Sequence, residues 1–212
     1  MDSTRLAQLL RPFFPDSELT PALVNQLQRY LELLLRWNAR VNLTSVRDPE
    51  QIVARHFGES LFTAQVLARH VADRASTTLA DLGSGAGFPG IPIKLVMPAL
   101  DVTLIESQNK KATFLREVVR ALALDRAHVF CGRAEQWQAT ADIVTLRAVE
   151  QFARVLPVAA KLAGPSGLLC LLIGENQIDT TRQLLRDGWN WREPTAVPDS
   201  LARRIVIAER VG

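Results

Sequence analysis

The feature that most constrains the fold is a short apolar run that leads directly into a glycine-rich turn, residues 77–90, with the sequence TTLADLGSGAGFPG. Leu79–Leu82 has the pattern of a buried strand, and a helix-like run, Ile91–Val96, follows the turn. The turn contains four glycines: Gly83, Gly85, Gly87 and Gly90. Because glycine has no Cβ, the backbone can approach a ligand closely and offer it free N–H groups. The stretch therefore predicts a nucleoside-cofactor site.

Two acidic residues near this turn bear on which cofactor binds. Glu106 ends the next strand-like run, Val102–Ile105, where a carboxylate can accept hydrogen bonds from ribose hydroxyls. Asp81, at the end of the first strand, would repel a pyrophosphate but suits the sulfonium and amino groups of S-adenosylmethionine. Counted from Gly83, the third glycine of a dinucleotide fingerprint is replaced by Phe88. The pattern favours S-adenosylmethionine over NAD, and a glycine turn without a ligand is the third alternative.

Alternating strands and helices follow from residue 77. The strand-like runs are Leu79–Leu82, Val102–Ile105, Ala127–Cys131, Ile143–Leu146 and Leu168–Ile173. Amphipathic helices are expected at Asn109–Leu124 and Val149–Leu162, and a tight turn at Gly164–Gly167. Two final strands, Trp189–Arg192 and Arg203–Glu209, suggest an antiparallel edge. The pattern predicts an α/β fold with a mostly parallel, Rossmann-like sheet of the class I methyltransferase type over residues 71–212.

The first part of the chain, residues 1–70, is expected to be a helical extension packed on this sheet. Thr20 is a candidate N-cap with Pro21 at the first helical position, and Asp48-Pro49 starts another helix in the same way. Apolar residues then recur at steps of three and four. Trp37 is interpreted as an anchor of the extension in the core.

Composition excludes few functions. The 212 residues are 48% hydrophobic and 22% charged, with a net charge of +3, which permits a nucleic-acid partner without requiring one. Cys131 and Cys170 lie in apolar runs without metal-ligand spacing, so we interpret them as reduced core thiols and expect no metal site. Neither a signal peptide nor a membrane-spanning run is recognisable, so a cytoplasmic protein is expected.

Several short stretches form a specific combination. They are Arg36-Trp37-Asn38 with Val41 to Ser45, Arg55-His56, Phe88 to Pro92, Glu106-Ser107 with Lys110-Lys111 and Phe114-Leu115, Arg133 to Glu135, and Arg147-Ala148. In this order they resemble the bacterial small-subunit ribosomal RNA guanine-N7 methyltransferases, the glucose-inhibited division protein B family, over nearly the whole chain. Two departures occur: Glu59 replaces an aspartate of the family pattern, and Ile173 replaces a lysine.

The resemblance implies methyl transfer from S-adenosylmethionine to N7 of a guanine in small-subunit (16S) ribosomal RNA. It adds Phe88, Ala134, Glu135 and Arg147 to the cofactor pocket, although Arg147 could instead cap a helix or pair with a surface carboxylate. The complete set of expected cofactor-binding residues is Asp81, Gly83, Gly85, Gly87, Phe88, Glu106, Ala134, Glu135 and Arg147.

This chemistry needs no general base. Guanine N7 has an in-plane lone pair and no proton to lose, so alignment of N7, the methyl carbon and sulfur provides most of the acceleration. Accordingly, no catalytic acid or base is assigned. The absence of an Asn-Pro-Pro-Tyr motif, typical of amine methylation, after the fourth strand agrees with this interpretation.

An RNA partner requires phosphate contacts. The candidates for binding the substrate RNA are Arg55, His56, Lys110, Lys111, Arg147 and Arg203. For each cation alone, a solvated surface charge is the alternative, and for His56 the alternative is a core histidine. The expected partner is ribosomal RNA or the 30S particle, with the protein acting as a monomer.

Three other functions stay open from the sequence. They are methylation of another RNA or of a protein, an RNA-binding ribosome-assembly role without catalysis, and an NAD-linked oxidoreductase. Binding of S-adenosylmethionine separates the first from the last two, and the identity of the methylated substrate separates the first from the leading hypothesis.

Overall fold

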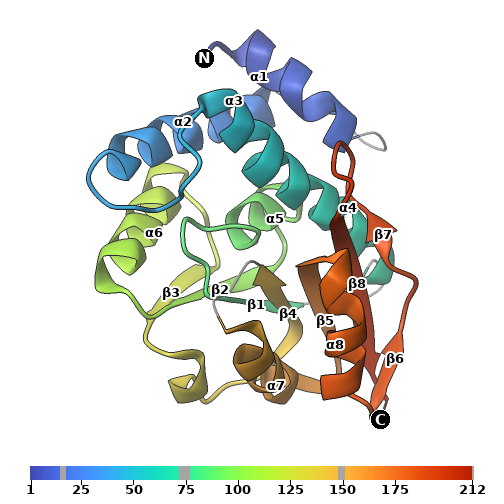
Figure 1. The fold of residues 1–212 in the computed structure, drawn as a ribbon. Coiled ribbons are helices and arrows are strands. Elements are labelled where there is room, and N and C mark those ends of the chain that lie inside the picture. Colours follow the sequence, from blue (N-terminus) through green and yellow to red (C-terminus); the bar gives the residue numbers. More distant parts are fainter. Residues whose placement is uncertain (15–17, 72–76, 148–150, 212) are drawn as a thin grey trace.

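The computed structural model describes residues 1–14, 18–71, 77–147 and 151–211 (Figure 1). Within these residues, eight strands form one sheet: β1 (Thr78–Leu82), β2 (Asp101–Glu106), β3 (Ala127–Cys131), β4 (Ala141–Arg147), β5 (Ala163–Gly174), β6 (Trp189–Trp191), β7 (Thr195–Ala196) and β8 (Arg203–Arg210). The order is β3-β2-β1-β4-β5-β8-β6, and the short β7 also pairs with β8.

The direction of the strands agrees with the sequence prediction. Strands β1 to β5 pair in parallel, while β8 runs antiparallel to β5 and β6 antiparallel to β8. Central parallel strands are covered on both faces, which is why they appear in the sequence as continuous apolar runs. The connection from β3 passes over β2 and β1 to reach β4, so the strand order reverses beside β1. Ligands of such sheets bind at the carboxyl ends of the strands at this reversal.

Helices form two layers around the sheet. Their bounds are α1 (Ser3–Leu10), α2 (Pro21–Asn38), α3 (Pro49–Ile52), α4 (Glu59–Val71), α5 (Gly90–Val96), α6 (Asn109–Ala121), α7 (Phe152–Leu162) and α8 (Ile178–Leu184), with a π-helical segment η2 (Val53–Gly58) and three short 3-10 turns, η1 (Arg11–Phe13), η3 (Ala134–Gln136) and η4 (Glu175–Gln177). Figure 1 shows α1 to α4 stacked above the sheet and α7 below it. Two apolar clusters, one on each side, correspond to these layers.

Helices α2 and α3 begin where the sequence predicts. The Thr20 hydroxyl accepts from the Leu23 N–H at 3.2 Å, and the Asp48 carboxylate accepts from the Gln51 N–H at 2.8 Å, so both predicted N-caps are present. Trp37 contacts α6 by donating from Nε1 to Glu117 at 2.9 Å, which confirms its role as an anchor. The apolar cluster above the sheet is continuous from α1 to α6.

Three local expectations require correction. Residues Gly164–Gly167 lie within β5 rather than before it; the pairing shifts from Ala141↔Ala163 to Ile143↔Leu168, so the predicted turn is a bulge in a longer strand. Helix α6 ends at Ala121, because Ala123 adopts a left-handed φ of 49°. Cys131 is exposed, because it ends β3 at the edge of the sheet, whereas Cys170 is buried as predicted.

Three further expectations concern the start of a helix, membrane spans and metal ions. The expected start of a helix at Val149 falls outside the described residues, and α7 is seen from Phe152. None of the described helices is both long and apolar enough to cross a membrane. In the same described part of the chain, no cluster of histidine, cysteine and acidic side chains could hold a metal ion.

Candidate active site

A cavity of about 780 Å³ opens at the carboxyl ends of β1, β2 and β4. One wall consists of the glycine turn and the ends of β2 and β3. The opposite wall comes from the N-terminal part of the chain and from Arg203. A second cavity, of about 1050 Å³, lies between α1 and the start of α2. The second cavity is larger but is separated in the fold from the glycine turn, so the chemistry is assigned to the first.

The glycine turn has the backbone geometry that the sequence predicts. Gly83, Gly85 and Gly87 have φ values of 66°, 58° and 89°, in the left-handed region that favours glycine. A Cβ on Gly85 would meet nothing nearer than the Gly83 carbonyl oxygen at 3.7 Å, so this part of the turn faces open space. A ligand can therefore approach the backbone at Gly83 and Gly85.

Asp81 lies behind the turn and does not line the cavity. Its fully buried carboxylate accepts from Thr145 Oγ1 at 2.7 Å and from the Gly90 N–H at 3.2 Å. Burial raises the pKa of this carboxyl group to about 6 despite those bonds. Asp81 thus joins β1, β4 and the start of α5, and it supports the turn from below instead of facing a cationic ligand.

Gly87 also lies outside the cavity lining. A Cβ at this position would collide with the Tyr30 hydroxyl and the Ile91 side chain. The Tyr30 hydroxyl donates to the Ala86 carbonyl, so α2 holds the far side of the turn. Gly87 is required for close packing of the extension on the turn, in contrast to the cofactor contact that was predicted for it.

Glu106 lines the cavity in the position expected for a ribose acceptor. Its oxygens accept from the Gly85 N–H at 2.9 Å and the Gln108 N–H at 2.7 Å, which fixes the carboxylate at the end of β2. A carboxylate oxygen has a second lone pair, so each one can still accept from a hydroxyl group. Ala134 and Glu135, on η3 after β3, line the same end of the cavity.

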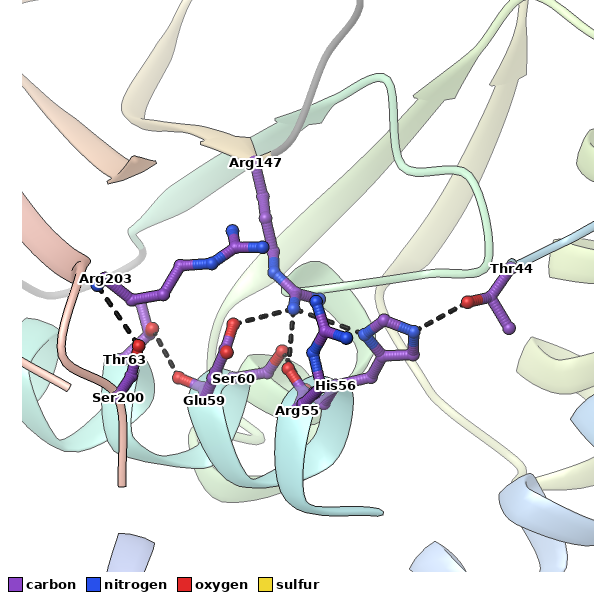
Figure 2. A network of polar contacts seen from close by, with 9 residues as sticks. All are labelled: Thr44, Arg55, His56, Glu59, Ser60, Thr63, Arg147, Ser200 and Arg203. Atoms are coloured by element: carbon purple, nitrogen blue, oxygen red, sulfur yellow. Dashed lines mark hydrogen bonds and ion pairs between the residues drawn. The ribbon is translucent and has the colours of Figure 1, made fainter. Parts of the chain in front are cut away.

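Arg147 ends β4 and joins it to the N-terminal helices (Figure 2). The two hydrogens of its Nη2 are shared among three acceptors: the Arg55 carbonyl oxygen at 2.6 Å, Glu59 Oε2 at 2.7 Å and, at the longest distance, His56 Nδ1 at 3.2 Å. The Arg147 and Glu59 side chains are each 6% exposed, so this is a buried ion pair and not the surface pair considered from the sequence. The buried Arg147 Nε has no hydrogen-bond partner among the described residues.

His56 belongs to this network. Its Nδ1 lies 3.2 Å from a guanidinium nitrogen, which only donates, so a proton on Nδ1 would oppose a second donor, and we assign the ring proton to Nε2. Nε2 then donates to Thr44 Oγ1 at 2.7 Å. Burial, and next the positive charges of Arg147 and Arg55, lower the pKa of His56 to about 3, so the ring is neutral near pH 7. Both ring nitrogens are thus occupied.

The segment that carries Arg55 and His56 is π-helical, η2, between α3 and α4. Such segments are rare and often lie at functional sites. At its end, Gly58 packs so tightly on Phe13 that a Cβ would lie 2.5 Å from the ring. This contact with η1 fixes the position of the π-helical segment relative to the sheet.

The remaining predicted site residues fall into two groups. Those that line the cavity are Gly83, Gly85, Phe88, Glu106, Ala134, Glu135, Arg147, Arg55, His56, Lys111 and Arg203. Lys110 does not; it is exposed on the first turn of α6, while the side chain of its neighbour Lys111 is directed to the cavity. Adjacent positions on a helix point about 100° apart, which explains the difference.

Sequence reasoning missed some lining residues. The loop Leu43–Val46 forms one wall, and Arg133 and Arg154 add two cations. The loop was noticed only as part of a motif, although the two asparagines that precede it, Asn38 and Asn42, were a usable signal. Asn38 Oδ1 accepts from the N–H groups of Leu43 and Thr44, both at 3.0 Å.

The strand order reverses beside a glycine turn, and the antiparallel β8 lies between β5 and β6; together these features place the sheet in the class I methyltransferase fold. Solved structures show the same fold: a SAM-dependent methyltransferase from Aquifex aeolicus is similar with a TM-score of 0.61 and 17% identity, covering 80% of this chain and 97% of that one. A ribosomal protein L11 methylase from Lactobacillus delbrueckii subsp. bulgaricus has a TM-score of 0.60 at 13% identity, over 75% and 80% of the two chains.

Sequence comparison identifies the family. The family model of GidB, rRNA small subunit methyltransferase G, matches residues 23–189, and the chain belongs to this family. The ribosomal RNA small subunit methyltransferase G of Stenotrophomonas maltophilia (strain K279a) is 41% identical over 193 residues, 89% of this chain and 87% of that protein. The protein of the same name from Xanthomonas euvesicatoria pv. vesicatoria (strain 85-10) is 40% identical over 198 residues, 92% and 90%.

Membership confirms the resemblance inferred from the motifs, and with it an enzyme that uses S-adenosylmethionine. The site fits this cofactor. Open space above Gly85 admits a nucleoside, and Glu106 can accept from its ribose hydroxyls. The free N–H groups expected along the turn require correction: those of Ser84, Gly85, Gly87 and Phe88 are bonded within the protein. The expected strand pattern and antiparallel edge are likewise confirmed.

Proposed function

We propose that this chain transfers the methyl group of S-adenosylmethionine to N7 of a guanine in small-subunit ribosomal RNA. The observation that carries the proposal is the state of His56, the only histidine among the described residues that line the cavity. Its Nδ1 lone pair is taken by Arg147 and its Nε2 carries the ring proton. This imidazole cannot remove a proton from a substrate, and guanine N7 has none to lose.

The two ends of the cavity suit two different molecules, the methyl donor and the base that accepts the methyl group. The carboxylates that line it, Glu106 and Glu135, lie after β2 and β3, at the cofactor end. The opposite end is lined by Arg147, at the end of β4, and by two residues of the N-terminal part: His56 in η2 and Thr44 in the loop after α2. We therefore assign the latter to the acceptor end, where the target base would enter.

The reaction balances without a proton transfer. S-adenosylmethionine supplies the methyl group, whose carbon bonds to N7 while its bond to sulfur breaks and the electron pair goes to sulfur. The protein's contribution is to hold the base and exclude water, which favours in-line attack. Glu59 lies 2.7 Å from Arg147 and offsets part of its positive charge, which lessens the repulsion of the cationic ring that forms.

Cations around the rim suit an RNA backbone. The lining cations are Arg55, Lys111, Arg133, Arg147, Arg154 and Arg203. Those with exposed guanidinium or ammonium groups can pair with phosphates, while an unpaired base reaches into the cavity. We propose that residues 1–70 act as an extension that provides the acceptor wall. We further propose that the enzyme works as a monomer, in the cytoplasm, on free ribosomal RNA or the 30S particle.

The test measures transfer of tritiated methyl from S-adenosylmethionine to small subunits that lack their own N7 methylation. Gly83→Asp should abolish labelling, because Gly83 lines the cofactor end of the cavity and an added carboxylate would compete for that space. Gly188→Asp is the matched control, since Gly188 also has a positive φ, 81°, but nothing lies within 4 Å of its Cβ position. Both positions have a positive φ, 66° and 81°, so the two variants carry comparable backbone strain, whereas only Gly83 lines the cavity.

Three outcomes separate the alternatives. Label on guanine N7 with the wild type and with Gly188→Asp, but not with Gly83→Asp, supports the proposal. Tight binding of S-adenosylmethionine without label on RNA would redirect the search to another substrate. A failure to bind the cofactor would favour a non-catalytic assembly role.

A further inference from the structure

Thr44 occupies a rigid position in the acceptor wall. The Asn38 side chain accepts from its backbone N–H at 3.0 Å, and Arg47 donates to the Asn38 carbonyl at 2.9 Å and to Asn42 at 2.7 Å. These bonds close the loop from the end of α2 to the start of α3. The Thr44 side chain is therefore presented to the cavity in a fixed orientation.

Both lone pairs of the Thr44 hydroxyl oxygen are occupied. His56 Nε2 donates to Oγ1 at 2.7 Å, and the Val46 N–H donates to the same oxygen at 3.1 Å. A hydroxyl has two acceptor positions and one hydrogen, so only the hydrogen remains available. No acceptor for it is found among the described residues. The hydroxyl can thus donate to a bound molecule but cannot accept from one.

The direction of this hydrogen-bond chain begins at Arg147. A guanidinium can only donate, which makes His56 Nδ1 an acceptor, His56 Nε2 a donor and Thr44 Oγ1 an acceptor in turn. Figure 2 shows the three side chains in line, with Arg147 reaching down from β4 to the ring of His56 and Thr44 on its far side. Arg147, a residue of β4, therefore decides whether the Thr44 hydroxyl donates or accepts toward a bound molecule.

We propose that Thr44 is a specificity-determining residue that donates its hydroxyl hydrogen to O6 of the target guanine. The inference rests on the proposed function. On the edge that carries N7, guanine presents two acceptors, N7 and O6, whereas adenine presents N7 and the N6 amino donor. A donor on N7 would occupy the lone pair that attacks the methyl group, so the hydroxyl can assist only by binding O6.

Adenine is excluded by the same arrangement. Its amino group would face an oxygen whose lone pairs are both filled, leaving two donors opposed and unpaired in a partly buried site. Unpaired polar groups of this kind reject the wrong substrate more strongly than a missing apolar contact does. The hydrogen-bond chain accordingly provides a reason for guanine selectivity that involves no charged contact with the base.

The experiment compares Thr44→Val with the wild type on two substrates. Small subunits are reconstituted with ribosomal RNA that carries either guanine or 2-aminopurine, which lacks O6 but retains N7, at the methylated position. For the wild type, kcat/KM should fall on 2-aminopurine. Thr44→Val should lose about 10- to 100-fold on guanine and show little further loss on 2-aminopurine. Thr44→Ser, which keeps the hydroxyl, should restore most of the guanine preference.

The ratio of the two substrates is the decisive quantity. The intrinsic reactivity of 2-aminopurine cancels when this ratio is compared between enzymes, and a general loss of folding would lower both rates alike. Thr180→Val, an exposed change on α8, should leave the ratio unchanged. An unaltered guanine preference in Thr44→Val would overturn the inference. Absence of methyl transfer to guanine by the wild type would instead contradict the proposed function itself.

Discussion

Arg147 and Glu59 form a buried ion pair, 2.7 Å between Nη2 and Oε2, although 88 residues separate them in the chain. The pair connects the last residue of β4 to the first residue of α4. It therefore joins the cofactor-binding sheet to the helical segments that carry Thr44 and His56. The position of the acceptor wall depends on this contact.

Removing the charge of Glu59 should destabilise the fold. Glu59→Gln leaves the buried Arg147 without its counter-charge, and the free energy of unfolding should fall by about 3 kcal/mol. Urea unfolding measures this loss. The matched control is Glu175→Gln in the Arg204–Glu175 pair, 2.9 Å apart but with Glu175 61% exposed, where a change of less than about 1 kcal/mol is expected. Equal effects of the two variants would contradict the buried-pair interpretation.

Asp81 should make stability depend on pH. Burial raises its pKa in the folded state to about 6 from an ordinary 3.8. A carboxyl group with a raised pKa stabilises the fold while protonated, so this contribution is present below pH 4 and is lost as the pH rises through 6. Relative to Asp81→Asn, the wild type should lose on the order of 3 kcal/mol across this window. Urea unfolding of both proteins between pH 4 and pH 7 measures the difference; parallel curves would refute the assignment.

His56 should stay neutral throughout the physiological range. Burial and the charges of Arg147 and Arg55 lower its pKa to about 3, so the ring should not titrate between pH 5 and pH 8. The ring carbon and proton NMR shifts, assigned by comparison with His56→Gln, should stay constant across that interval. An inflection near pH 6.5 would show that the ring is solvated and that the hydrogen-bond chain to Thr44 is not maintained.

Gly90 should not tolerate a methyl group. A Cβ there would lie 2.6 Å from Leu104 Cδ2 and 2.8 Å from Asp81 Oδ2, so Gly90→Ala must displace the support of the glycine turn. We expect a loss of about 1–3 kcal/mol in unfolding free energy and weaker binding of S-adenosylmethionine by calorimetry. Gly164→Ala, whose nearest neighbour would lie at 3.6 Å, provides the control and should change neither quantity appreciably.

Lys110 and Lys111 should differ in their contribution to RNA binding. Lys111 lines the cavity and Lys110 does not, although they are adjacent in the sequence. Lys111→Ala should lower RNA affinity and reduce the slope of log affinity against log salt by about 1, as expected for one lost phosphate contact. Lys110→Ala should have the smaller effect. A larger effect of Lys110→Ala would indicate that RNA follows the outer face of α6 instead of the cavity rim.

The sequence by itself determined the main strands of the sheet, the glycine turn and the starts of α2 and α3. These features depend on local chemistry: apolar runs for β1 to β5, φ values that only glycine adopts readily at Gly83 and Gly85, and capping oxygens at Thr20 and Asp48. The family motifs, which are also local, identified the class of enzyme and its cofactor. Glu106 lines the cavity as the sequence predicts, because it is the last residue of a strand that ends there.

Only the tertiary structure decided which polar groups face the ligand and which face each other. Asp81 and Glu106 are both carboxylates at strand ends, yet packing of α5 buries the first while the second lines the cavity. The chain from Arg147 through His56 to Thr44 joins residues 91 and 12 positions apart. Neither contact has a local sequence signal, because burial and hydrogen-bond direction arise when the N-terminal helices pack on the sheet and water is excluded between them.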